Sequence, residues 1–447
     1  MNLIPQGGST LARGIVIAAP RSGSGKTMLA LGLMRAFRNA GLAVAGAKCG
    51  PDYIDPAFHA AATGKQSFNL DSWAMPPALL GELGMAAGKA CDFVLCEGLM
   101  GLFDGVPGEP ARTGSSADVA AALGWPVLLV LDVSGQSQSA AAVVQGCTSF
   151  DPRIEIAGVV LNRVASPRHR HLVGASIEAL GFRVLGALPR DEKISLPERH
   201  LGLVQARETP DLDERLDRIA AFVEAHVDLG AVRASARACS ALPGAVSRGL
   251  PPPAQRIAIA RDEAFSFLYP HILMGWRNAG AELAFFSPLA DEPPPGDCDL
   301  LWLPGGYPEL HAGQLAAAGR FLEGLRHFAK AKPVHGECGG YMMLGQSLTD
   351  EAGHTHAMAG LLGASFSFAK RKLHLGYRQA RLAAFHSLGP KNSRLRGHEF
   401  HYATVEAKSE ADSPFAFVQD AHGGSEEAEG SRRGEVSGSF FHVIAAE

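Results

Sequence analysis

The sequence predicts an α/β protein with two domains, each built on a largely parallel sheet. Short apolar runs alternate with helical segments in both halves of the chain, and the runs in the first half are apolar on both faces. That pattern is typical of parallel strands covered by helices on both sides. The chain has 447 residues, and at roughly 150 residues per domain two or three domains are expected.

The first domain is expected over residues 1–229, where strands and helices alternate regularly. The expected strands are 14–19, 44–49, 92–97, 126–133, 156–164 and 183–188. The expected helices are 27–39, 78–89, 117–123, 138–147, 168–180 and 212–227. This order predicts a doubly wound sheet, whose ligands bind at the carboxyl ends of the strands.

The second domain is expected over residues 256–447. Residues 230–255 are rich in Ala, Gly, Ser and Pro and are predicted to be a linker. A new alternation follows, and its expected strands are 256–260, 282–286, 300–303 and 333–335. Residues 420–435, rich in Gly, Ser and charge, are expected to form an exposed loop before the last strand.

Composition excludes several classes of protein. The net charge is −4, from 41 Lys and Arg against 45 Asp and Glu, and nucleic-acid binding rests on an excess of Lys and Arg. No apolar run reaches the roughly 18 residues of a membrane span, and residues 1–13 lack the apolar stretch of a signal peptide. Seven cysteines without a CxxC pair argue against a zinc site and favour a reduced, cytoplasmic protein.

A glycine-rich turn follows the first predicted strand and leads into a predicted helix. Such a turn binds phosphate when small residues let N–H groups converge, a lysine balances phosphate charge and a hydroxyl binds magnesium. Lys26 and Thr27 supply the last two groups at a helix start, which favours anions. The strict pattern has glycine where this chain has Pro20, and the alternative is a turn that binds no nucleotide. The candidate nucleotide-binding residues are Gly23, Ser24, Gly25, Lys26 and Thr27.

Carboxylates follow three of the predicted strands. Asp52 and Glu97 are the first candidates to hold magnesium beside the phosphate loop, together with Thr27. Lys48 either adds positive charge toward the phosphates or lies on the surface, and Asn162 either reads a base edge or closes a turn. Three further carboxylates either join the site or cap a helix or turn: Asp55, Asp104 and Asp132.

The second domain contains a candidate nucleophile. Cys338 lies in a Gly-x-Cys-x-Gly turn between a strand and a helix, which is the elbow that lifts a nucleophile above a sheet. The backbone N–H groups of Gly306 and Gly339 are candidate donors to an oxyanion. The alternative is that Cys338 is a small buried residue.

A cysteine nucleophile needs a base, which is usually a histidine distant in sequence. His442 on the last predicted strand is the best candidate. The competing histidines are His335, His374, His398 and His401.

These motifs together resemble the cobyrinate/hydrogenobyrinate a,c-diamide synthases of cobalamin biosynthesis. The first half is similar to dethiobiotin synthetase, and the second half looks like a class I glutamine amidotransferase. The resemblance covers residues 14–442. Its most specific stretches are 20–27, 48–56, 97–105, 196–202, 335–340 and 396–402.

The resemblance implies a P-loop domain fused to an amidotransferase domain and an ATP-dependent double amidation. Glutamine is hydrolysed through a thioester on Cys338, and the ammonia passes inside the protein to the first domain. There ATP, with Mg²⁺, phosphorylates an acetate carboxylate of the corrinoid, and ammonia displaces the phosphate. The family amidates the c acetate and then the a acetate. The implied partners are small molecules (corrinoid, glutamine and ATP), and dethiobiotin synthetase makes a homodimer plausible by analogy.

Carried over to this chain, the resemblance assigns roles to individual residues. Catalysis falls to Cys338, His442 and Glu97, with Glu97 and Asp52 near magnesium and the reacting carboxylate. The phosphate loop holds the nucleotide phosphates. The remaining assignments are Asn162 at the adenine, and Tyr53 and Asp104 facing the substrate. Gly306 and Gly339, the candidate oxyanion donors named above, would face the substrate in the second domain.

One position departs from ordinary class I amidotransferases, which have a glutamate two residues after the histidine. Here that position is Ile444. The family that the chain resembles also lacks this glutamate, which suggests a Cys338–His442 dyad with slow intrinsic glutaminase activity. Glu447, at the end of the chain, is not expected to orient the histidine.

Other functions fit parts of the pattern. Within the same enzyme class the alternatives are cobyric acid synthase and nickel-sirohydrochlorin diamide synthase. A MinD-like switch ATPase with an inert amidotransferase domain is the alternative from another class. The intact Gly-x-Cys-x-Gly turn and His442 argue against the switch.

Overall fold

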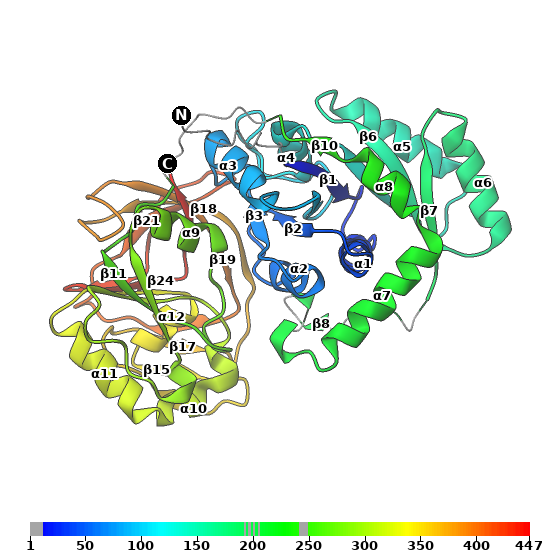
Figure 1. Cartoon of the computed structure of the whole chain (residues 1–447). Helices are drawn as coiled ribbons and strands as arrows, with labels where there is room; N and C mark the ends of the chain where they lie inside the picture. The colour runs from blue at the N-terminus through cyan, green and yellow to red at the C-terminus, as the bar shows by residue number, and fades with distance from the viewer. Residues whose placement is uncertain (1–11, 192–193, 195–197, 200–201, 204–205, 241–248) are drawn as a thin grey trace, which may run out of the picture. The chain divides into compact units, whose positions relative to one another are not determined.

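The computed structural model describes residues 12–191, 194, 198–199, 202–203, 206–240 and 249–447. The chain forms two compact units, Met1–Ser247 and Arg248–Glu447. Residues 1–11 and most of the stretch 196–202 lie outside the described residues. The α/β class predicted for both halves is confirmed (Figure 1).

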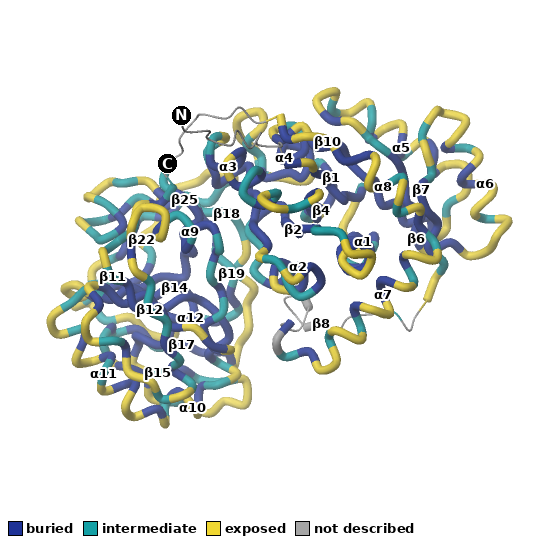
Figure 2. Tube along the Cα trace, viewed as in Figure 1, coloured by how far each residue is buried: buried dark blue, intermediate teal, exposed yellow. Residues whose placement is uncertain are grey.

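The first unit is a parallel sheet with the strand order β3-β2-β4-β1-β5-β6-β7. Its strands are buried because helices cover both faces, which explains their apolar sequences (Figure 2). The strands are β1 (Arg13–Ala18), β2 (Val44–Cys49), β3 (Phe68–Leu70), β4 (Phe93–Glu97), β5 (Val127–Asp132), β6 (Ile156–Val164) and β7 (Val184–Pro189). Strand β3 was not expected from the sequence. A short antiparallel pair, β8 (Glu198–Arg199) and β9 (Gly202–Leu203), lies apart from the sheet.

The helices of the first unit follow the expected positions within a few residues, except for α2, which was not expected. Helix α1 packs against α7, and a Cβ atom on Gly32 would lie 2.4 Å from Val223, so the two helices approach closely because this residue is glycine. The helices are α1 (Lys26–Asn39), α2 (Asp55–Thr63), α3 (Pro77–Ala87), α4 (Ser116–Leu123), α5 (Ser139–Phe150), α6 (Pro167–Glu178) and α7 (Leu212–His226).

The segment expected to be a linker, 230–255, begins with regular structure. Helix α8 (Leu229–Ser235) starts at Asp228, whose side chain accepts the Ala231 N–H at 2.8 Å. Strand β10 (Arg237–Ala238) then pairs antiparallel with β1. Small apolar residues such as Val232 are buried here, so the composition that suggests a linker belongs partly to the core of the first unit.

The second unit has a six-stranded sheet in the order β12-β11-β13-β14-β24-β23. All neighbours are parallel except β23 and β24. The strands are β11 (Arg256–Ala260), β12 (Glu282–Phe286), β13 (Leu300–Leu303), β14 (Val334–Glu337), β23 (Ser431–Arg433) and β24 (Val436–Ser439). The helices are α9 (Pro270–Asn278), α10 (Ala312–Ala317), α11 (Gly319–Ala329) and α12 (Gly339–Leu344).

Two further sheets complete this unit. The five-stranded antiparallel sheet contains β18 (His374–Leu382), β19 (Arg394–His401), β21 (Ala416–Asp420), β22 (Glu427–Glu429) and β25 (His442–Ala446). The four-stranded sheet contains β15 (Ser347–Thr349), β16 (Thr355–Ala357), β17 (Ser365–Ser367) and β20 (Thr404–Ala407). The prediction of a loop over 420–435 was wrong in part, because β22 and β23 pair with neighbouring strands there. Within the described part of the chain, every helix is too short or too polar to cross a bilayer.

The second unit buries several histidines, and this predicts instability in mild acid. Burial lowers the pKa of His271 to about 4 and of His401 to about 3, and burial together with Arg432 lowers that of His386 to about 4. The unfolded chain therefore binds more protons than the folded one below the ordinary histidine pKa of about 6.5. We expect the urea midpoint to fall as the pH falls from about 6.5 toward 4, and the fall to be shallower in His386→Asn. A wild-type midpoint that does not change between pH 7 and 5 would contradict this expectation.

Candidate active site

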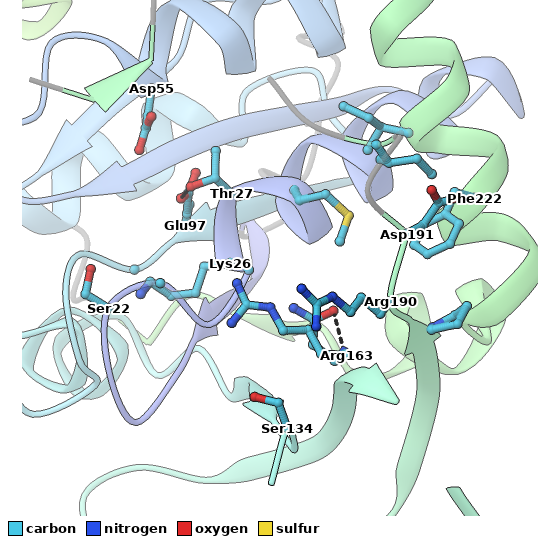
Figure 3. A pocket seen from close by; sticks show the side chains of 18 of the residues that line it. Ser22, Lys26, Thr27, Asp55, Glu97, Ser134, Arg163, Arg190, Asp191 and Phe222 are labelled. Atoms are coloured by element: carbon cyan, nitrogen blue, oxygen red, sulfur yellow. Dashed lines mark hydrogen bonds between the residues drawn. The ribbon is translucent and has the colours of Figure 1, made fainter. Parts of the chain in front are cut away.

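A cavity of about 990 Å³ opens at the carboxyl ends of the strands of the first unit (Figure 3). It runs from Lys48 and Asp55, past the phosphate loop, to Arg190 and Phe222. Seven predicted site residues line it: Gly23, Gly25, Lys26, Thr27, Asp52, Glu97 and Asn162. Segments that are far apart in sequence therefore meet at the edge of the sheet where ligands of doubly wound folds bind.

The phosphate loop turns sharply into α1 at Gly25, which has a φ of 93°. A Cβ atom there would lie 2.2 Å from Asn162 Nδ2, so the position requires glycine both for its conformation and for space. Lys26 is buried, and its Nζ donates a hydrogen bond to the Met100 carbonyl at 2.5 Å. Burial lowers the pKa of Lys26, and the positive charge of Lys48 lowers it further. The loop thus presents a largely desolvated cation beside free space.

Glu97 lies at the centre of a buried network. Its Oε1 accepts hydrogen bonds from Thr27 Oγ1 at 2.5 Å and lies 3.1 Å from Lys48 Nζ. Its Oε2 accepts one from His59 Nε2 at 2.7 Å. Burial alone would raise the pKa of Glu97, but Lys48 and His59 bring it below its usual range, so the side chain is a carboxylate. Figure 3 shows Thr27 beside Glu97.

Lys48 is buried, so the alternative of a surface lysine was wrong. It forms an ion pair with Asp55 at the start of α2. Burial by itself would lower the pKa of Lys48, but the surrounding carboxylates, first Asp55 and then Glu97, raise it above its usual range. The lysine therefore keeps its positive charge and faces the cavity from β2.

Other predicted residues have partly structural contacts. Asn162 lines the cavity, but its Nδ2 donates to the Ser24 carbonyl at 2.8 Å and its Oδ1 accepts the Arg163 N–H at 2.9 Å, so the amide braces the phosphate loop. Asp132 is held by Arg163 and Arg21 at 2.7 and 2.6 Å. The cavity is also lined by His169, Pro189, Arg190 and Phe222.

The two residues expected to face the substrate, Tyr53 and Asp104, are not among the residues that line the cavity. Asp104 is exposed and its Oδ2 accepts the Gly101 N–H at 2.8 Å, which is the turn role left open above. Asp52 lines the cavity while its Oδ1 accepts the N–H groups of Ile54 and Asp55. Their roles toward substrate remain predictions.

The second unit forms the predicted elbow. Cys338 stands between β14 and α12 with φ 46° and ψ −102°, a conformation that side-chain-bearing residues rarely adopt. A Cβ atom on Gly340 would lie 2.0 Å from the Leu303 carbonyl oxygen, so α12 starts directly against the end of β13. This tight turn places Cys338 at the carboxyl end of the parallel sheet.

The predicted oxyanion donors lie beside the thiol. The backbone N–H groups of Gly339 and Gly306 are close enough to the Cys338 sulfur to lower the pKa of the thiol, and a Cβ atom on Gly339 would lie 3.1 Å from the Gly306 nitrogen. Burial raises the pKa of the thiol and Glu309 raises it further, against the effect of these two N–H groups. The resting cysteine is therefore protonated, and a base has to take its proton.

His442 is the histidine placed to do so. A Cβ atom on Gly305 would lie 2.4 Å from His442 Cε1 and 3.3 Å from Cys338 Cβ, so both side chains border the same small space. Other contacts occupy the competing histidines. His335 bonds Ser437, His398 bonds Tyr269 and lies beside His442 with ring centroids 5.2 Å apart, and His374 stacks on His401.

Gly305→Ala should therefore impair the cysteine site selectively. The backbone fixes where the added methyl group would lie, and that place is 2.4 Å from His442 Cε1. The methyl group would therefore displace the fully buried His442 ring. We expect glutamine hydrolysis to fall about 100-fold while ATP binding is unchanged. Glutaminase assays and nucleotide titration of the same preparation check this, and a variant with normal glutaminase activity would contradict the placement of His442.

Two family models match the chain, one in each of its two units. Residues 15–204 match one described as a CobQ/CobB/MinD/ParA nucleotide binding domain. Residues 256–447 match one described as a CobB/CobQ-like glutamine amidotransferase domain.

Hydrogenobyrinate a,c-diamide synthase of Mesorhizobium japonicum is 57% identical over 97% of this chain and 99% of that protein. The chain belongs to the hydrogenobyrinate a,c-diamide synthase family. Proteins of that name from Rhodobacter capsulatus and Agrobacterium fabrum are 57% and 54% identical, also over 97% of this chain and 99% of each.

Sequence reasoning missed two residues beside these sites. His59 contacts Glu97, and Glu337 lies 3.8 Å from His442 Nδ1. Glu337 directly precedes Cys338, so its position in the motif was a usable signal. His59 lies in the middle of α2, and because that helix was not predicted, nothing in the sequence indicated that His59 contacts Glu97 at the end of β4.

Proposed function

We propose that this protein catalyses the ATP- and glutamine-dependent amidation of hydrogenobyrinic acid, at the c acetate and then at the a acetate, in cobalamin biosynthesis. The observation that carries the proposal is a likeness of 57% over 97% of the chain to proteins named for this product. The two sites support it chemically. One presents a cysteine nucleophile with oxyanion donors, and the other presents a phosphate loop with a buried carboxylate and two lysines.

The second unit supplies ammonia. Cys338 attacks the side-chain carbonyl carbon of glutamine, and His442 takes the thiol proton. The N–H groups of Gly306 and Gly339 stabilise the oxyanion. Ammonia leaves with the proton from His442, and water then hydrolyses the thioester to glutamate.

The first unit activates the carboxylate of the corrinoid. A carboxylate is a poor electrophile, and transfer of the γ-phosphate of ATP converts it into an acyl phosphate with a good leaving group. Lys26 and the loop N–H groups bind the phosphates and offset their charge, and Lys48 can attract the carboxylate. Ammonia then displaces phosphate to give the amide.

Magnesium fits the oxygen atoms at this site. Thr27 Oγ1 and Glu97 Oε1 converge at 2.5 Å, and Asp52 lines the same cavity. A hydroxyl and one or two carboxylates, completed by phosphate oxygens and water, are the ligands Mg²⁺ prefers. We propose that these three residues hold the ion, which would neutralise the charge of the transferring phosphoryl group.

The amidated acetates and the state of the ring can be tested directly. Purified protein is given ATP, magnesium and glutamine with hydrogenobyrinic acid in one tube and cobyrinic acid in another, and products are followed by mass spectrometry. We expect two successive amidations, faster with the metal-free acid. ATP hydrolysis without amidation in either tube would overturn the proposal in favour of a switch ATPase or another acceptor.

The setting of the reaction follows from its substrates. ATP and glutamine are abundant in the cytoplasm, which is where we propose the protein acts. A homodimer stays a prediction based on the similarity to dethiobiotin synthetase, and gel filtration with light scattering tests it.

A further inference from the structure

Glu337 is the last residue of β14 and directly precedes the nucleophile. Its side chain is 5% exposed. One carboxylate oxygen, Oε1, accepts the backbone N–H of Val443 at 2.9 Å. The other, Oε2, lies 3.8 Å from His442 Nδ1. Both contacts are to β25: Oε1 is held by the Val443 N–H, and Oε2 faces the imidazole of His442.

A histidine that accepts a proton from a thiol works best when a third group fixes its orientation and tautomer. The residue two positions after His442, where ordinary class I amidotransferases have a glutamate, is the buried Ile444. Strand β25 itself therefore offers no carboxylate on that face. Glu337 lies near the ring instead, at the end of β14 in the other sheet.

We propose that Glu337 is the positioning residue of the glutaminase site. It holds His442 with Nδ1–H toward the carboxylate and Nε2 available for the Cys338 thiol. When the thiol proton moves to Nε2, the carboxylate stabilises the positive ring. The proton then leaves with ammonia as the thioester forms. This inference rests on the proposed glutaminase role of Cys338.

The surroundings of His442 support a role for the charge. His398 lies beside the ring with its centroid 5.2 Å away. Burial lowers the pKa of His398 well below its usual range, and His442 and Arg378 lower it further, so it stays neutral and adds no positive charge beside His442. Glu309 raises the pKa of the Cys338 thiol, and the Glu337 carboxylate lies 3.8 Å from His442 Nδ1.

The competing role is purely structural, as an acceptor for the Val443 N–H. Glu337→Gln separates the two, because the amide oxygen keeps that hydrogen bond while the charge is lost. We expect kcat for glutamine hydrolysis to fall roughly 100-fold with KM for glutamine changed less than about threefold. Alkylation of Cys338 by iodoacetamide should slow in parallel. Amidation with ammonium on the same preparation reports whether the fold is intact.

Two variants complete the test. Glu337→Asp keeps the charge one methylene further away, and its kcat should lie between those of wild type and Glu337→Gln. Glu435→Gln removes an exposed carboxylate from the turn before β24 and should match wild type. A kcat of Glu337→Gln within about twofold of wild type, or an Asp variant no better than Gln, overturns the inference. Absence of glutaminase activity in the wild type would instead overturn the proposed function.

Discussion

Cys338→Ala is expected to abolish amidation supported by glutamine while amidation supported by ammonium continues. Without the thiol no thioester can form, and removal of a nucleophile of this kind costs at least about 1,000-fold in kcat. Ammonium bypasses the loss because the carboxylate is activated in the other unit. The measurement is product formation by mass spectrometry with each nitrogen source at saturating ATP and corrinoid.

Cys298→Ala is the matched control. Cys298 is also buried in the second unit, but it precedes β13 at the amino end of the sheet, opposite the nucleophile elbow. It should retain activity with both nitrogen sources. If ammonium fails to support amidation in Cys338→Ala while the protein remains folded, the division of labour between two sites is wrong.

Lys26→Ala is expected to lose amidation with either nitrogen source, by about 100- to 1,000-fold. The buried ammonium group of Lys26 is expected to bind the β and γ phosphates, and at a site this desolvated its removal leaves much of their negative charge without compensation. Glutamine hydrolysis measured on its own should persist, because the cysteine site lies in the other unit. Amidation rates with glutamine and with ammonium, together with ATP consumption, check this.

Lys89→Ala tests whether loss of any lysine from the same unit has this effect. Lys89 is exposed beyond the end of α3, far in sequence from the loop, and its variant should resemble wild type. Retained amidation in Lys26→Ala would remove the phosphate loop from the mechanism and leave the cavity of the first unit without an assigned nucleotide.

The positions of most strands and of the two sharp turns that carry site residues could be predicted from the sequence, because both depend on local patterns. Strand β6 was expected at the residues where it occurs, and the turns at Gly25 and Cys338 follow from short motifs whose conformation is set within a few residues. Seven predicted residues then line one cavity because carboxyl ends of parallel strands share one edge of a sheet. Local reasoning was sufficient wherever the topology itself brings residues together.

Predictions were less complete where packing between distant segments decides the outcome. Whether Lys48 is exposed depends on Asp55 and Glu97, which compensate its burial, and composition does not report such compensation. The antiparallel sheet that carries His442 was not expected beyond its last strand, so the approach of Glu337 to the ring was not expected either. Residues 230–240 show the same effect. Their Ala- and Ser-rich sequence predicts a linker, but in the structure it forms α8 and then β10, which pairs with β1.

The backbone of Cys338 has a consequence for anyone who selects variants of this protein. A positive φ at a residue with a side chain costs about 1–3 kcal/mol, and glycine relieves that cost. A screen that rewards only survival on heating would therefore favour Cys338→Gly, which also removes the nucleophile. At this position selection for thermal stability and selection for activity favour different amino acids. A heat-resistant variant therefore has to be screened for glutamine-dependent product formation as well.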